Sequence, residues 1–200
     1  MKFWKLPVLA ACLLAVASCN SSSSDSVKEA QQTNEAKIDS TTQNTGQGEA
    51  VRDDKTNDSE FMTKAASGGM LEVELGKVMA QRATTPEAKQ FAQQMVTDHT
   101  KANNELKALA AKKNITLPAS LGDDQKKVYD EVLAEKGIKL DQKYVSEMVD
   151  DHQEDVKQYQ DASTNAGDPE VRALAAKTLP TLKEHLAMAE KIKPTVDAKK

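Results

Sequence analysis

The chain has 200 residues, of which 38% are hydrophobic but only 4% aromatic, and its formal net charge is −4. A net negative surface repels the phosphates that drive nucleic-acid binding, so we exclude nucleic acid as a partner. A core built from Ala, Leu, Val and Met with few aromatic residues favours helices over sheets, so the composition predicts an all-α protein.

The N-terminus has the three parts of a secretory signal peptide. Lys2 and Lys5 provide positive charge, and the apolar run over 6–16 is shorter than the roughly 20 residues that cross a bilayer. The run ends in Val16-Ala17-Ser18-Cys19, which resembles the lipobox that the lipoprotein signal peptidase recognises. Residues 1–18 are therefore predicted to be a cleaved lipoprotein signal peptide, and Cys19 is predicted to carry lipid.

A lipidated Cys19 predicts a place in the cell envelope. Several acyl chains hold a protein stably at a membrane, whereas a single chain binds only marginally. Asn20 follows the cysteine, and signals of this kind without Asp at that position usually direct proteins to the outer membrane. We expect a protein that is anchored to the outer membrane through lipid and faces the periplasm. The alternative is an ordinary secreted protein cut near Ala17.

Cysteine usage excludes thiol chemistry in the mature protein. The chain has two cysteines: Cys12 lies in the predicted signal peptide, and Cys19 would carry the lipid. The remaining chain then has no free thiol, so disulfides and thiolate metal sites are excluded.

The segment that follows the predicted lipid site is polar. Residues 19–57 are rich in Ser, Thr, Gln, Asn, Asp and Glu and have hardly an apolar residue. Such a segment buries too little surface to offset the entropy lost on ordering. We predict a disordered tether that reaches on the order of 35 Å as a flexible coil.

Helical periodicity begins at about residue 58. Two helix starts are marked by the same pattern, a capping residue followed by proline and glutamate: Thr85-Pro86-Glu87 and Asp168-Pro169-Glu170. The long helices have matched lengths and are joined mostly by short turns, which predicts one antiparallel four-helix bundle over 58–195. The expected helices are 59–83, 86–113, 139–165 and 169–193, with a short extra helix over 123–136.

Two of the long helices share a motif. Phe91, Met95 and His99 in the second helix match Tyr144, Met148 and His152 in the third, with Val after each Met and Asp before each His. Two antiparallel helices related by a two-fold axis would place equivalent residues at equal depth. The alternative is coincidence between two amphipathic helices.

One ionisable residue on each long helix falls on the apolar stripe. These residues are Glu72, His99, His152 and His185, the last three being the only histidines of the chain. At 1.5 Å per residue all four lie within roughly two turns of the middle of the bundle. Three imidazoles and one carboxylate would suit a single zinc, iron or copper ion.

Each histidine follows an acid, namely Asp98, Asp151 and Glu184. These acids point about 100° away from their own histidine, so we expect them to orient neighbouring histidines as hydrogen-bond acceptors. The alternative is a buried polar layer of Glu72 and the three histidines that holds no metal.

Glycines interrupt the first long helix at Gly68, Gly69 and Gly76. They lower helix propensity, which predicts close packing against a neighbouring helix, or else room for a ligand.

Four stretches together resemble the domain-of-unknown-function 4142 family of exported bacterial proteins. They are FMTKAASGGMLEVELGKV, AKQFAQQMVTDHTKANNELKALA, LDQKYVSEMVDDHQEDVKQY and LAAKTLPTLKEHLAMAEKI. The resemblance covers about 60–193 and implies a ferritin-like helical bundle and an outer-membrane location. It implies no activity, because the function of that family is not established.

The ferritin-like resemblance does not extend to di-iron chemistry. Di-iron members carry a Glu-x-x-His pair on each of two helices. In this chain the residues three positions before the histidines are Val96, Val149 and Leu182. At most a mononuclear site is therefore expected.

These observations lead to one main hypothesis and two alternatives. We expect a non-enzymatic, lipid-anchored envelope protein whose bundle binds a metal ion or an envelope protein partner. The first alternative is a metal-dependent oxidoreductase or metal-storage protein that uses the Glu/His3 site. The second is a purely structural bundle on a tether. No phosphate-binding loop or Ser-His-Asp arrangement is present.

Overall fold

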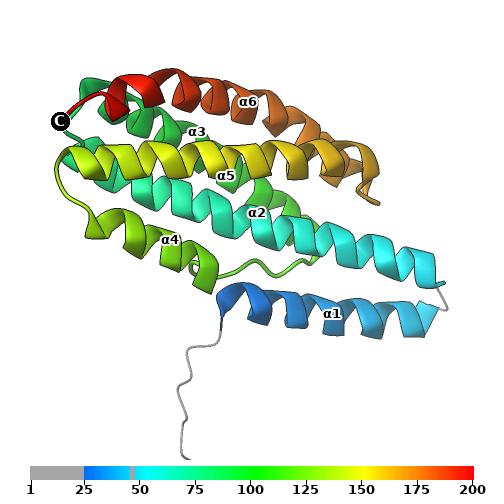
Figure 1. The fold of residues 1–200 in the computed structure, drawn as a ribbon. Coiled ribbons are helices and arrows are strands. Elements are labelled where there is room, and N and C mark those ends of the chain that lie inside the picture. The colour runs from blue at the N-terminus through cyan, green and yellow to red at the C-terminus, as the bar shows by residue number, and fades with distance from the viewer. Residues whose placement is uncertain (1–24, 46–47) are drawn as a thin grey trace, which may run out of the picture.

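A computed structural model describes residues 25–45 and 48–200. This part of the chain is all-helical and has no β-strand (Figure 1). Its six helices are α1 (Ser26–Thr45), α2 (Glu49–Arg82), α3 (Pro86–Lys113), α4 (Asp123–Ala134), α5 (Ile138–Asn165) and α6 (Pro169–Asp197).

Helices α2, α3, α5 and α6 form a four-helix bundle (Figure 1). Short turns join α2 to α3 and α5 to α6, which makes two antiparallel hairpins. The connection from α3 to α5 instead returns along the bundle through α4, so α5 begins at the same end as α3. A single long crossover of this kind is the topology of ferritin-like bundles.

Local sequence explains where α3 and α6 begin. The Thr85 hydroxyl accepts a hydrogen bond from the backbone N–H of Ala88, and the Asp168 carboxylate accepts one from that of Glu170. Proline occupies the next position in both helices, where its missing N–H costs no helical hydrogen bond. The helix starts predicted from these two patterns are confirmed.

The core is divided by a polar layer. One apolar cluster lies toward the α2–α3 turn and includes Leu75, Phe91 and Met148. The other lies toward the α5–α6 turn and includes Met62 and Leu182. The three histidines fall between the two clusters in sequence on every helix that carries one, so the candidate site is enclosed by apolar packing on both sides.

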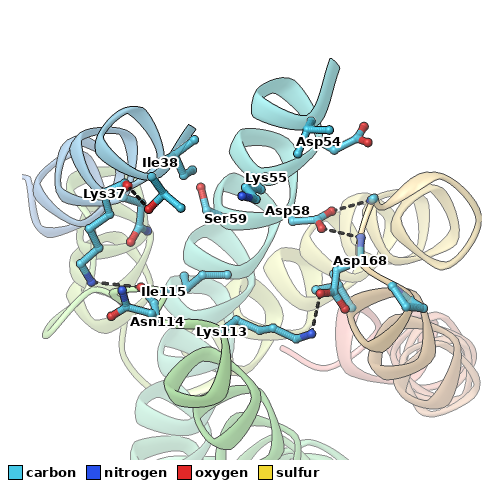
Figure 2. Close-up of a pocket in the computed structure, with 16 residues that line it drawn as sticks. Lys37, Ile38, Asp54, Lys55, Asp58, Ser59, Lys113, Asn114, Ile115 and Asp168 are labelled. Carbon is cyan, nitrogen blue, oxygen red and sulfur yellow. Dashed lines mark hydrogen bonds and ion pairs between the residues drawn. The ribbon is translucent and has the colours of Figure 1, made fainter. Parts of the chain in front are cut away.

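A buried aspartate of the first hairpin holds the turn of the second. Asp58 on α2 accepts hydrogen bonds from the backbone N–H groups of Gly167 at 2.8 Å and Asp168 at 2.7 Å (Figure 2). The Asp58 side chain therefore holds the α5–α6 turn against α2.

The second hairpin holds the turn of the first in the same way. Asp141 on α5 is fully buried and accepts the backbone N–H groups of Thr84 at 3.0 Å and Thr85 at 2.7 Å. It also accepts both threonine hydroxyls, at 3.0 and 2.8 Å. Asp58 and Asp141 each lie 24 residues before the last residue of their helices, so the two hairpins are related by an approximate two-fold repeat.

The prediction of a disordered tether over 19–57 is wrong for most of its described residues. Residues 26–45 form α1, and α2 begins at Glu49 rather than near 58. Helix α1 packs along α2, and polar side chains hold it to the connection between α3 and α4. Asn34 is buried and exchanges hydrogen bonds with the backbone of Thr116 in that connection, at 2.9 and 2.7 Å. Polar side chains thus replace the apolar stripe that periodicity detects.

The motif shared by α3 and α5 meets in the core, but not through antiparallel helices. The rings of Phe91 and Tyr144 lie 6.0 Å apart, and those of His99 and His152 lie 5.4 Å apart. Because both pairs meet in the same order along the chain, α3 and α5 run parallel across the diagonal of the bundle. The antiparallel relation expected for these two helices is therefore wrong, whereas neighbouring helices are antiparallel.

Gly76 lies at a close approach of α2 and α3. A Cβ at Gly76 would lie 2.8 Å from Cγ2 of Val96 and 3.1 Å from the carbonyl oxygen of Ala92, whereas one at Gly68 would meet nothing within 4 Å. We expect Gly76→Ala to lower the free energy of unfolding by about 1–3 kcal/mol through overpacking. Gly68→Ala is the matched control and should raise it by about 0.5–1 kcal/mol. Urea unfolding checks both values, and equal stability of the two variants would contradict the packing argument.

None of the helices in the described ranges is long and apolar enough to cross a membrane. The predicted signal peptide over 1–18 and the predicted lipid site Cys19 lie outside the described residues.

Candidate metal centre

The three histidines come together in the polar layer. His99 on α3, His152 on α5 and His185 on α6 have exposed fractions of 4%, 0% and 1%. One nitrogen from each ring lies within 4.8 Å of the others. Each histidine belongs to the inward stripe of its helix, and this is why the predicted convergence occurs.

The spacing of the ring nitrogens fits a tetrahedral metal ion. Nδ1 of His185 lies 3.1 Å from Nε2 of His99 and 3.4 Å from Nε2 of His152. Metal–nitrogen bonds of 2.0–2.1 Å in a tetrahedron place their nitrogens about 3.4 Å apart. The cluster therefore needs little movement to surround one ion.

The other nitrogen of every ring has its own acceptor. Nδ1 of His99 lies 2.6 Å from Oε2 of Glu72, and Nε2 of His185 lies 2.9 Å from Oδ2 of Asp98. Nδ1 of His152 lies 3.0 Å from the backbone carbonyl oxygen of Met148. An acceptor on the outer nitrogen fixes the tautomer and directs the inner lone pair toward the centre, as in histidine metal sites generally.

Glu72 contributes in two ways. It is only 1% exposed, and Oε2 holds His99 while Oε1 lies 3.3 Å from Nε2 of His152. Oε1 is close to that nitrogen but has no hydrogen-bond partner among the described residues. A buried carboxylate oxygen without a partner is costly, and a metal ion would satisfy it. Glu72 is therefore the candidate for the fourth position of a tetrahedral site, although the group within 4.8 Å contains only the three histidines.

Burial keeps the histidines neutral. It lowers the pKa of His99 to about 4 and the pKa of His152 well below its usual value, with further lowering at His152 from His99 and His185. Burial also lowers the pKa of His185, although the hydrogen bond to Asp98 opposes this. Neutral imidazole is the form that binds a metal ion.

The pKa values of the buried carboxyl groups change in the opposite direction. Burial, reinforced by the charge of Asp151, raises the pKa of Glu72 well above its usual value. Burial also raises the pKa of Asp151 to about 6. Burial therefore makes the charged form of these carboxyl groups costly, and a bound divalent cation would offset that cost.

The three acids that precede the histidines in sequence do not all accept a hydrogen bond from a histidine. Asp98 binds His185 of the neighbouring helix at 2.9 Å. Asp151 binds no histidine by a hydrogen bond among the described residues, and its Oδ2 is buried without a partner. Glu184 is exposed, and no described hydrogen bond joins it to the cluster, although its charge opposes the lowering of the pKa of His185. Its position on α6 faces solvent because the helix buries His185 instead.

Two groups near the candidate centre were not predicted from the sequence. The carbonyl of Met148 orients His152 from one turn earlier on α5, a contact that any helical histidine could make and that no sequence pattern marks. Burial, reinforced by the charges of Glu72 and Asp151, raises the pKa of Asp155 well above its usual value. Its spacing, four residues after Asp151 on the same face of α5, was the signal that could have revealed it.

One cavity in the described structure lies away from the histidines. A cavity of about 490 Å³ opens at the end of the bundle between α1, α2 and the α5–α6 turn (Figure 2). Several charges in its walls are already used within the fold. Asp58 binds the turn, Lys113 binds Asp168, and Lys37 binds the carbonyl of Asn114. We therefore place the candidate site at the histidines and not in this cavity.

Similarity to solved structures is limited to the fold. A DUF305 fragment from Deinococcus radiodurans is similar with a TM-score of 0.61 and 12% identity, over 70% of this chain and 96% of that one. CopM in its Cu(II)-bound form is similar with a TM-score of 0.59 and 17% identity, over 69% of this chain and 96% of that one. Identities this low carry no site residues from one chain to the other.

Comparison by sequence gives a family. No curated protein matches the chain. The sequence profile of the domain of unknown function DUF4142 matches residues 40–192, which is most of the chain and includes all four residues of the candidate centre. The protein therefore belongs to the DUF4142 family.

Proposed function

We propose that this protein binds one divalent transition-metal ion in the core of its bundle and does so without catalysis, as a lipid-anchored protein of the cell envelope. The ligands are His99, His152 and His185, with Glu72 in the fourth position. One observation carries the proposal: three buried ring nitrogens lie at metal-site spacing while each ring is held from outside by its own acceptor.

The closed centre argues against an enzyme. Catalytic zinc sites keep one coordination position open for water or substrate, whereas structural sites fill all four with protein ligands. Here four protein donors are available, and no ligand is more than 4% exposed. A hollow beside Asp98 and Thr178 has a volume of only about 80 Å³. A substrate would have no space next to the ion.

The donor set favours zinc or copper(II). Three imidazole nitrogens and one carboxylate oxygen suit borderline divalent ions, and no thiolate is available to select a soft ion. The Cu(II)-bound form of CopM, which has a similar fold, supports the choice of copper as one of the ions to test.

Elemental analysis tests the centre. The protein, expressed in the envelope and purified without a histidine tag or chelator, should contain about one equivalent of zinc or copper. The His99→Ala/His152→Ala double variant should contain less than a tenth of that, because half of the ligands are gone. Gln153→Ala, an exposed neighbour on the same helix, is the control and should keep its metal. A metal-free wild type that also fails to take up added zinc, copper or iron would leave the polar layer as the correct interpretation.

Lipid anchoring at Cys19 is the second part of the proposal and is supported by the sequence Val16-Ala17-Ser18-Cys19. Since α1 begins at Ser26, only a short connection separates the proposed lipid from the first helix. Seven residues span at most about 25 Å. The bundle would therefore lie near the membrane surface rather than reach far into the periplasm.

We expect Cys19→Ser to abolish acylation and to remove the protein from the outer-membrane fraction. Serine cannot form the thioether on which this class of lipid anchor depends. Mass spectrometry of the N-terminal peptide and membrane fractionation check the result, with Ser18→Ala as the control because it keeps a small residue before the cysteine. An acyl mass on the wild type that persists in Cys19→Ser would contradict the assignment.

A further inference from the structure

The ligands of the candidate centre are closed off from solvent within the described structure. The three histidines and Glu72 are each no more than 4% exposed. An ion can therefore reach them only if the bundle opens locally. Local opening occurs most readily where backbone hydrogen bonds are missing. The place of entry should combine a weakened helix with a polar group that extends from the surface to a ligand.

Asp98 is a polar group that joins the centre to the surface. Its Oδ2 lies 2.9 Å from Nε2 of His185, and its side chain is 26% exposed. The other two acceptors of the histidine rings belong to Glu72 and Met148, which are 1% and 0% exposed. Of the three groups that hold the histidines from outside, only Asp98 can therefore meet an ion from solvent.

The hollow of about 80 Å³ lies against Asp98, between α3 and α6. Its walls include Asp98 and Glu105 of α3, and Lys177 and Thr178 of α6. An ion pair of 2.7 Å between Nζ of Lys177 and Oε2 of Glu105 joins the two helices at this hollow. No histidine is among the described residues of its walls, so Asp98 separates the hollow from the centre.

Helix α6 is interrupted beside the same hollow. Pro180 lies inside α6, between the two threonines that line the hollow, and five residues before His185. Because proline has no N–H, the carbonyl oxygen of Ala176 receives no helical hydrogen bond from this position. The Thr178 hydroxyl binds the carbonyl oxygen of Leu174 at 2.9 Å, a contact that also bends helices.

Packing does not explain this proline. Pro180 is exposed, so its ring fills no space in the core. Its effect on the molecule is to weaken α6 at the hollow, and proline is a common position for a bend in a helix. The weakened helix and the partly exposed carboxylate thus lie on opposite sides of one hollow next to His185.

We propose that the interface of α3 and α6 at Asp98 and Pro180 is the gate through which the divalent ion enters and leaves the histidine centre. The Asp98 carboxylate attracts the ion and is the first protein group that it meets. Movement of α6 at Pro180 separates His185 from Asp98 and lets the ion pass. When α6 returns, Asp98 again accepts the hydrogen bond from Nε2 of His185 and closes the centre. This inference rests on the proposed function, because it describes access to the same ion.

A gate has a kinetic signature that a ligand does not have. It lies on the path of the ion, whereas the free and bound end states are unaffected by it. A change at the gate therefore alters the rates of entry and exit by the same factor and leaves the Kd unchanged. A change in a ligand, or in a group that positions a ligand, alters the Kd.

Cobalt(II) is the probe, because its visible absorption is much stronger at a tetrahedral site than in water. The full-length protein in detergent is stripped of metal and mixed rapidly with excess Co(II), and the loaded protein is then mixed with excess EDTA. Pro180→Ala restores the hydrogen bond to the carbonyl of Ala176. We expect it to slow uptake and release by about fivefold each, the factor that one net hydrogen bond gives, with an unchanged Kd. Pro194→Ala, the same change at an exposed position of α6, should have the rates of the wild type.

A second variant acts in the opposite direction. Lys177→Met keeps the aliphatic stem but removes the ion pair with Glu105 that joins α3 to α6. We expect uptake and release to become about threefold faster, because a partly exposed ion pair contributes little more than this. Lys183→Met removes an exposed charge from the same helix away from the hollow and should leave both rates unchanged. Both test positions are exposed, so neither variant removes a core contact.

The outcomes separate the gate from the proposed function. Unchanged rates in Pro180→Ala or in Lys177→Met overturn the gate and leave the histidine centre. An altered Kd in Pro180→Ala overturns it as well, because α6 would then position His185 rather than admit the ion. Slower uptake and release in Asp151→Asn alone would place entry on the side of α2 and α5, where Asp151 lies close to Glu72. A wild type that takes up neither cobalt nor zinc overturns the proposed function instead.

Discussion

Saturation with zinc is expected to raise the midpoint temperature of unfolding by about 8–16 °C. A ligand that binds only the folded state at a thousand times its Kd stabilises that state by about 4 kcal/mol. For a protein of this size each kcal/mol corresponds to roughly 2–4 °C. The gain has a structural source, because the ion would satisfy Oε1 of Glu72, which has no hydrogen-bond partner among the described residues. Differential scanning calorimetry with zinc and with a chelator measures the shift.

His152→Ala should remove most of this shift. The alanine variant loses a fully buried ligand whose Nε2 lies close to both His185 and Glu72. It will also melt lower without metal because of the cavity, so the relevant quantity is the difference between the zinc and chelator scans of the same variant. Gln153→Ala should keep the full shift. A zinc-dependent rise of the same size in His152→Ala would contradict the assignment of the ligands.

Asp141→Ala is expected to lower the free energy of unfolding by about 3–5 kcal/mol. The fully buried carboxylate accepts the backbone N–H groups and the hydroxyls of Thr84 and Thr85. Its removal leaves the buried N–H and hydroxyl of Thr85 without a partner, at a cost of about 1–3 kcal/mol each, whereas the donors of the exposed Thr84 can turn to water. Guanidinium unfolding of the metal-free protein measures the loss without interference from the centre.

Asp150→Ala is the control for this prediction. It removes an exposed carboxylate from the same helix and should change the free energy of unfolding by no more than about 0.5 kcal/mol. The loss of unfolding free energy in Asp58→Ala should lie between those of Asp141→Ala and Asp150→Ala, because Asp58 accepts hydrogen bonds from two donors and Asp141 from four. Equal midpoints for Asp141→Ala and Asp150→Ala would show that the turn does not depend on the carboxylate.

The sequence was sufficient to predict the four-helix bundle but not the N-terminal helix α1. The two Pro-Glu helix starts and the apolar stripes are local signals, so they placed α3, α5 and α6 to within a few residues. Helix α1 is stabilised through Asn34 and Lys37, whose hydrogen bonds reach residues 82 and 77 positions away. Contacts that distant are not encoded in composition or periodicity, and the polar segment therefore resembled a tether.

The candidate centre shows the same limit. Helical spacing predicted that Glu72 and the three histidines would face inward, and they do. It could not assign their roles, because a role depends on the rotation of each helix about its axis. That rotation directs Asp98 to His185, leaves Asp151 oxygen without a partner and turns Glu184 to solvent.

The exchanged aspartates make the two hairpins interdependent. Asp58 completes the turn of the second hairpin, and Asp141 completes the turn of the first. In either hairpin alone, the backbone N–H groups of the turn would lose their carboxylate acceptor, and the aspartate would lose its donors. Neither hairpin is therefore expected to fold by itself. Cleavage of the chain in the connection that precedes α4 should therefore give two fragments that are largely unfolded when separated and that regain helical structure only when they are mixed. The two similar hairpins would then fold as one cooperative unit.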